Sequence, residues 1–216
     1  SQSTPQSTSS TALWGAFDRF NYGDLLFPIV TERALRHLGY LGATSAFGLK
    51  KSDLRLYDAR PTDSLADLRT SDIDNIIVAG GEGLGARWFN MHLHISTLPL
   101  TYILKGLRKT LGLETADYIS RTLLKVRDYP LPWVLPQTAF AGEPNLIYNS
   151  VGGGINIVRL PETAKQYLVD TLGQATYVSV RDRYTQTVLA ELGIKAHLAP
   201  DSAALMACTC RDLTAS

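Results

Sequence analysis

The stretch Asn75-Ile76-Ile77-Val78-Ala79-Gly80-Gly81-Glu82-Gly83 decides how the rest of the chain is interpreted. Ile76 to Ala79 form a continuous apolar run, which is typical of a strand covered on both faces, as in a parallel sheet between helices. The run ends in glycines, where the backbone can turn sharply because no Cβ is in the way. In open α/β sheets, ligands bind at the carboxyl ends of the strands. The end of this strand is therefore a candidate binding site.

The composition favours one large globular domain. The 216 residues are 45% apolar and carry a formal net charge of +1, from 21 basic and 20 acidic side chains. No strongly basic stripe is present, so nucleic-acid binding is not expected as the main function. No apolar run approaches the roughly 20 residues of a transmembrane segment, and association with a membrane surface is left open. Cys208 and Cys210 make no disulfide framework, so a cytoplasmic location is the simplest interpretation.

The first part of the chain predicts strands, helices and irregular segments. Residues 12–17 predict the first strand, and Asp24 then caps a helix that ends near Leu38. Pro130, Pro132 and Pro136 interrupt the later pattern and indicate a long surface connection. The remaining expected elements are two strands, over residues 43–47 and 54–57, and two helices, over residues 97–111 and 115–125.

The second part of the chain alternates regularly between strand and helix. Three strands, over residues 145–150, 175–180 and 194–198, are separated by helices over residues 161–172 and 183–192. Repeated strand-then-helix units with glycine stops are typical of parallel sheets. The sequence therefore predicts an α/β fold with a Rossmann-like, mainly parallel sheet and helices on both faces.

Several polar or glycine-rich segments follow the predicted strands and would meet at one edge of a parallel sheet. They are residues 21–24, 80–83, 150–153, 181–182 and 201. Each alone is common turn chemistry, but their joint placement favours a functional site. Asp24 either caps its helix or positions or deprotonates a hydroxyl group. His92 and His94 could lie on one side of a strand and bind a metal, but no third ligand is placed near them, so no metal site is expected.

Arg181 has two interpretations that the residues alone leave open. It follows an apolar strand and precedes a helix N-terminus, where a guanidinium suits a phosphate or carboxylate ligand. Alternatively, Asp182 caps the helix while Arg181 pairs with a carboxylate on an adjacent loop.

The ordered set of segments resembles the polysaccharide pyruvyl transferase family. The resembling pieces are Phe20-Asn21-Tyr22-Gly23-Asp24, Ile76-Ile77-Val78-Ala79-Gly80-Gly81, Ser150-Val151-Gly152, Val178-Ser179-Val180-Arg181-Asp182, and Leu192-Gly193-Ile194 followed by Pro200-Asp201. The resemblance implies one half of a two-domain fold like that of the GT-B glycosyltransferases. Residues 12–206 are expected to form this Rossmann-like domain, after a disordered tail over residues 1–11. Residues 207–216 are expected to be a C-terminal tail or the start of a second domain.

The resemblance also implies an activity. The family transfers the enolpyruvyl carbon of phosphoenolpyruvate to two hydroxyls of a sugar in a surface polysaccharide, which forms a pyruvate ketal without a cofactor. By this analogy Arg181 would bind the donor, and Asp24, the expected catalytic residue, would lie near the acceptor hydroxyls or the proton transfer. The full set of expected substrate-binding residues is Asn21, Gly80, Gly81, Glu82, Ser150, Gly152, Gly153, Arg181 and Asp201. A nucleotide-sugar glycosyltransferase of GT-B type and a non-catalytic sugar- or anion-binding domain are the alternatives.

Overall fold

The computed structural model describes residues 9–205, which form one seven-stranded sheet with the strand order β3-β2-β1-β4-β5-β6-β7. Every pair of neighbouring strands is parallel. The strands are β1 (Ser10–Trp14), β2 (Ala43–Phe47), β3 (Thr62–Asp63), β4 (Asn75–Ala79), β5 (Asn145–Val151), β6 (Tyr177–Val180) and β7 (His197–Leu198). The predicted Rossmann-like parallel sheet is confirmed.

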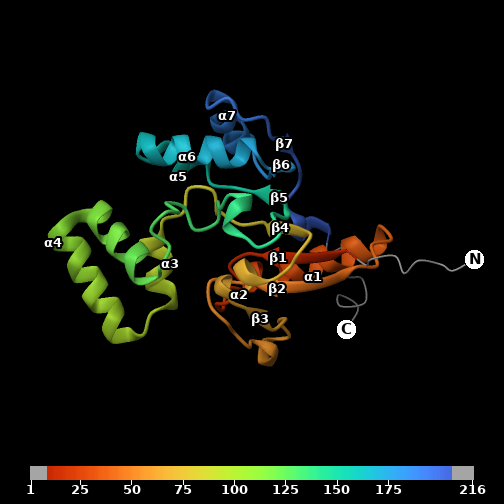
Figure 1. The fold of residues 1–216 in the computed structure, drawn as a ribbon, viewed down its shortest axis with the longest axis horizontal. Helices are drawn as coiled ribbons and strands as arrows, with labels where there is room; N and C mark the ends of the chain where they lie inside the picture. Colours follow the sequence, from red (N-terminus) through yellow and green to blue (C-terminus); the bar gives the residue numbers. More distant parts are fainter. Residues whose placement is uncertain (1–8, 206–216) are drawn as a thin grey trace, which may run out of the picture.

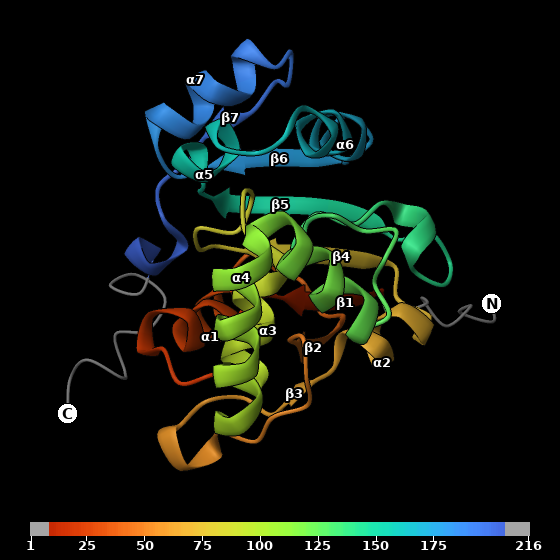
Figure 2. The ribbon, with the colours of Figure 1, turned by 90° about the vertical axis from the view of Figure 1, so that its left-hand side faces the viewer.

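Helices connect the strands on both sides of the sheet (Figures 1 and 2). The α-helices are α1 (Tyr22–His37), α2 (Leu65–Thr70), α3 (Trp88–Ile95), α4 (Leu98–Leu123), α5 (Gly154–Val158), α6 (Glu162–Gly173) and α7 (Arg183–Glu191). The short 3-10 helices are η1 (Arg55–Tyr57), η2 (Gln137–Ala139) and η3 (Ser202–Leu205). Helix α4 consists of two pieces that meet at Gly112, whose φ of 82° is not helical. This break agrees with the two helices predicted for this segment.

The apolar side chains of the central strands divide between the two faces of the sheet, because successive residues of a strand point in opposite directions. Leu13 and Ile77 belong to a cluster with Phe27 of α1, and Ala203 of η3 packs against it. Helix α1 and η3 therefore cover one face.

The opposite face carries the larger core. Trp14 and Val78 point to this side and pack in a cluster with Leu68 of α2 and Leu168 of α6. With helices on both faces, the continuous apolar run of β4 is buried as predicted.

Two local predictions were wrong. Residues 54–57 form no strand, because this segment turns through η1 and a left-handed Asp58 (φ 56°), and β3 pairs with β2 instead. The proline-containing segment is not a surface connection, because Leu131, Val134 and Leu135 are buried in the larger core. Proline prevents regular hydrogen bonding, but the apolar side chains between the prolines still pack inward.

The start of α1 also differs from the prediction. The helix begins at Tyr22 with Asn21 at its N-cap, so Asp24 lies within the first turn and is not the cap. The acidic side chain is still at the positive end of the helix.

The sheet begins at Ser10, two residues before the predicted start of the domain. The rest of the predicted N-terminal tail, residues 1–8, lies outside the described residues, as do the predicted C-terminal segment and both cysteines, within residues 206–216. Across residues 9–205, none of the helices is both long enough and apolar enough to span a membrane.

Candidate functional site

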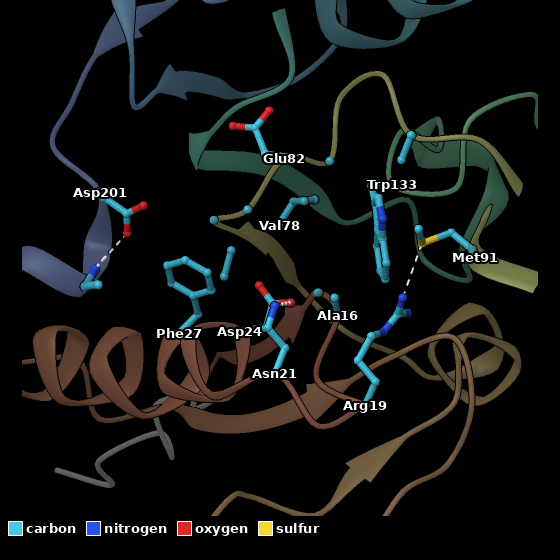
Figure 3. A pocket seen from close by; sticks show the side chains of 18 of the residues that line it. Ala16, Arg19, Asn21, Asp24, Phe27, Val78, Glu82, Met91, Trp133 and Asp201 are labelled. Carbon is cyan, nitrogen blue, oxygen red and sulfur yellow. Dashed lines mark hydrogen bonds between the residues drawn. The ribbon is translucent and has the colours of Figure 1, made fainter. Parts of the chain in front are cut away.

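A pocket of about 770 Å³ opens at the carboxyl ends of β1 and β4 (Figure 3). The strand order reverses between these two strands, and such a switch point is where open α/β sheets bind ligands. Residues 15–24 and 78–83 supply most of the lining, and Met91, Trp133 and Arg181 complete it with a few neighbours.

Two glycine turns form the part of the pocket that follows β4 and β5. Gly80 and Gly81 have φ values of 63° and 77°, a left-handed conformation that favours glycine. The two loops are joined by backbone hydrogen bonds: the Gly152 N–H donates to the Gly81 carbonyl (2.8 Å), and the Leu84 N–H donates to the Gly152 carbonyl (3.1 Å). The parallel pairing of the strands thus continues into the loops, which gives this part of the pocket a fixed backbone.

Asp24 projects from the first turn of α1 into the pocket (Figure 3). Its Oδ2 accepts a hydrogen bond of 2.8 Å from Asn21 Nδ2, and its Oδ1 lies on the side of Gly81, 3.9 Å from where a Cβ would stand on that glycine. Burial raises the pKa of the Asp24 carboxyl above its ordinary value, against the hydrogen bond from Asn21 and the nearby charges of Arg19 and Arg181. The side chain is therefore anchored through one oxygen, and burial favours proton uptake by the group.

Arg181 lies between two carboxylates at another wall of the pocket. Its Nη1 donates to Asp201 Oδ2 at 3.0 Å, and its Nη2 donates to Glu82 Oε1. Asp182 caps α7 by accepting from the Thr185 N–H at 2.7 Å. The ion-paired alternative for Arg181 is thus present in the structure, while about a quarter of the side chain remains exposed at the pocket.

Three of the predicted residues lie next to the pocket without lining it. Gly152 stands beneath Arg181, where a Cβ would come within 2.9 Å of Arg181 Nε. Ser150 is buried, and its hydroxyl donates to the Pro200 carbonyl at 2.8 Å. Gly153 packs against the backbone of Leu84. These residues shape the loops, and all the other predicted residues line the pocket.

The pocket also contains side chains that the sequence interpretation did not select. Arg19 follows β1 and contacts Asp18 through its Nε (3.0 Å) and Met91 Sδ through its Nη1 (3.5 Å). His94 comes from helix α3, not from the strand considered for it, and burial and the charge of Arg19 lower its pKa. Trp133 comes from the proline-containing segment. The available signal was that Arg19 lies in the loop after the first strand, because the same rule identified the other loops.

A comparison with protein families adds an independent observation. The family model described as polysaccharide pyruvyl transferase matches residues 21–215, which is most of the chain. The chain belongs to the polysaccharide pyruvyl transferase family. No curated protein and no solved structure matches it. The resemblance inferred from the ordered sequence segments is therefore confirmed.

For a member of the pyruvyl transferase family, the chemistry available in the pocket is acid–base and electrostatic. Asp24 can exchange a proton, and Arg19, Arg181 and His94 supply nitrogen donors for an anion. Within the described part of the chain, no three His, Cys, Asp or Glu side chains gather as a potential metal site.

Proposed function

We propose that this protein transfers the pyruvyl group of phosphoenolpyruvate to two hydroxyls of one sugar residue in a polysaccharide, as a ketal. The observation that carries the proposal is the position of Asp24. In a chain of the pyruvyl transferase family, this half-buried carboxylate faces a glycine turn inside the pocket at the switch point of the sheet.

The donor would enter with its anionic groups toward the arginines. Phosphoenolpyruvate carries a phosphate and a carboxylate, and guanidinium groups bind both with paired hydrogen bonds. Arg19 already contacts one carboxylate, that of Asp18, which also accepts the backbone N–H groups of Leu49 and Lys50. Arg181 would have to release Glu82, whose side chain is 58% exposed and can move toward solvent.

The acceptor would lie at the mouth of the pocket next to Phe20. The ring of Phe20 is 64% exposed, lines the pocket, and packs against the ring of Tyr57 with centroids 4.6 Å apart. An exposed aromatic pair offers a flat apolar surface to the C–H face of a sugar ring. From this position the sugar hydroxyls could reach the carboxylate of Asp24.

The proposed reaction consumes one phosphoenolpyruvate and two hydroxyls and releases one phosphate. A proton adds to the methylene carbon, which becomes the methyl group, and the first hydroxyl oxygen bonds to the neighbouring carbon. The bond from that carbon to the phosphate oxygen then breaks, and the second hydroxyl oxygen takes its place. The two hydroxyls lose two protons in total. One of them compensates for the proton that was added to the methylene carbon, and the other leaves with phosphate. Asp24 would accept the proton of an attacking hydroxyl.

The test uses the protein expressed from its complete coding sequence, with phosphoenolpyruvate and a panel of glycosides that carry diols able to close five- or six-membered ketals. Phosphate release that depends on the glycoside, together with a new ketal methyl signal in proton NMR, is the expected result. Transfer of the glycosyl group of a nucleotide sugar to the glycoside with release of the nucleotide, and no consumption of phosphoenolpyruvate, would instead assign a glycosyltransferase. Binding of sugars with no consumption of either donor would assign a non-catalytic binding domain.

A further inference from the structure

Helices α3 and α4, residues 88–123, form an arm at one end of the molecule (Figure 1). The arm has a small apolar core of its own, made by Phe89, Leu104 and Ala116, apart from the two cores that pack on the sheet. Asp117 ties the two helices together by accepting the Phe89 N–H at 2.9 Å. One side of α4 therefore packs against α3, and the other side of α4 is left uncovered.

The uncovered side of α4 is apolar over its first piece. Leu98, Tyr102 and Ile103 are 75%, 72% and 64% exposed. At 100° per residue these three side chains fall within one broad arc of the helix, away from buried Leu104. Three large apolar side chains exposed on one helix face indicate an interaction site more than scattered surface residues do.

The charged side chains on the first piece of α4 have a single sign. The first piece of α4 contains no Asp or Glu but contains Lys105, Arg108 and Lys109, although the whole chain is nearly balanced. Arg87, before α3, pairs with Glu114 in the second piece of α4 and adds no free charge. Lys105 and Lys109 are exposed and one helical turn apart, beside Leu98 and Tyr102. A second copy of the chain would bring lysines against lysines, so charge complementarity favours an anionic partner.

We propose that the arm docks on an anionic membrane surface, with Leu98, Tyr102 and Ile103 inserted at the level of the lipid headgroups and with Lys105 and Lys109 near their phosphates. A helix with an exposed apolar face and a basic polar face binds in this way. The mouth of the pocket would then lie close to the membrane, because Met91 and His94 of α3 line it. The docking surface is independent of the reaction proposed above.

Sedimentation with lipid vesicles tests the proposal on the full chain. We expect binding to vesicles of phosphatidylcholine mixed with phosphatidylglycerol, and much weaker binding to phosphatidylcholine alone. Binding should fall when salt is raised to about 1 M, where the Debye length is about 3 Å.

Two double variants locate the surface. Lys105→Glu/Lys109→Glu should lower the vesicle partition coefficient by at least about 30-fold, because each basic residue near an anionic surface contributes about fivefold. Tyr102→Ser/Ile103→Ser should also lower it, by removing the inserted side chains. The matched controls, Lys50→Glu/Lys195→Glu and Leu41→Ser/Leu56→Ser, change exposed residues outside the arm and should bind like the parent chain.

Three results would overturn the proposal. The first is no binding to phosphatidylglycerol vesicles at low salt by a folded parent chain. The second is binding that the control variants weaken as much as the arm variants do. The third is a dimer, seen by light scattering, that the arm variants dissociate, since this would assign the face to a second copy. Because every substituted side chain is exposed, circular dichroism should show the same fold for all variants.

Discussion

The two arginines of the pocket are held in different ways. Arg181 lies between Glu82 and Asp201, so two carboxylates surround one cation before any ligand arrives. Among residues 9–205, Arg19 has a single carboxylate partner, and its buried Nη2 makes no well-oriented hydrogen bond there although it lies 3.0 Å from Asp18 Oδ1. A position at the rim of the sheet therefore does not by itself decide which arginine is available to an anion. The number of carboxylates around each guanidinium is equally important.

Asp24 interacts electrostatically with both arginines, and changing it should have the largest effect. If it accepts a proton from the acceptor, Asp24→Asn should lower kcat by about 100-fold or more, while Asp170→Asn, an exposed control, should not. Steady-state phosphate release measures both. Full activity in Asp24→Asn would assign proton transfer to another group.

The same variant has a defined effect on stability. Burial raises the pKa of Asp24 in the folded state above its value of 3.8 in the unfolded chain. The folded state therefore binds the proton more tightly, and the wild-type protein gains stability as pH falls from neutral through the folded pKa. Asn is neutral at every pH, so melting curves of Asp24→Asn should lack this gain and should match or exceed those of the wild type near pH 7.

Exchanging each arginine for lysine tests the comparison directly. Arg19→Lys should weaken phosphoenolpyruvate binding by roughly 10- to 100-fold, because a charge-assisted pair of hydrogen bonds contributes about 1.5–3 kcal/mol and lysine cannot form the planar pair. Arg181→Lys should lower the melting temperature, by weakening the contacts of Arg181 with Glu82 and Asp201, and should weaken phosphoenolpyruvate binding less than Arg19→Lys does, because these two carboxylates already occupy the Arg181 guanidinium. Calorimetric titration and thermal melts of both variants measure this. Unchanged phosphoenolpyruvate affinity at lowered stability in Arg181→Lys would place Arg181 outside the donor site.

Removing one carboxylate from Arg181 should sharpen the contrast with a smaller effect. Glu82→Gln removes a negative charge from the pocket and releases a guanidinium nitrogen, so phosphoenolpyruvate should bind about fivefold more tightly. This corresponds to about 1 kcal/mol, the energy of two unit charges about 4 Å apart in water. Glu162→Gln is the control, because Glu162 pairs with Lys165 on α6, outside the pocket. Unchanged affinity in Glu82→Gln would mean that the donor lies away from Arg181.

The sheet and one wall of the pocket could be predicted from the sequence because they depend on local patterns. A continuous apolar run followed by Gly80 and Gly81 indicates a buried parallel strand and a turn at its end, and the structure contains both. Trp133 could not be predicted in the same way, because the prolines of its segment interrupt the regular pattern from which inward packing is predicted. His94 was misplaced because a short apolar segment is compatible with strand or helix, and packing against α4 decides for helix.

The prediction of where α1 starts depended on a similarly weak sequence signal. Asn21 and Asp24 are both good N-cap residues, and only the backbone conformation selects Asn21.

Arg181 shows a different limit of prediction from sequence. The sequence offered both a ligand role and an ion pair, but the carboxylates that pair with it come from loops 99 and 20 residues away.

The hydrogen bonds between the loops after β4 and β5 have a consequence for how this pocket could diversify. Gly81, Gly152 and Leu84 are joined through their main chains, so altering the side chains nearby leaves the floor of the pocket in place. On the opposite rim, the Gly15 N–H donates to the Phe47 carbonyl at 3.1 Å, and Phe20, five residues further along this loop, is exposed. We therefore expect new acceptor preferences to arise by changes in residues 15–24 and in α3, while the donor side keeps its shape.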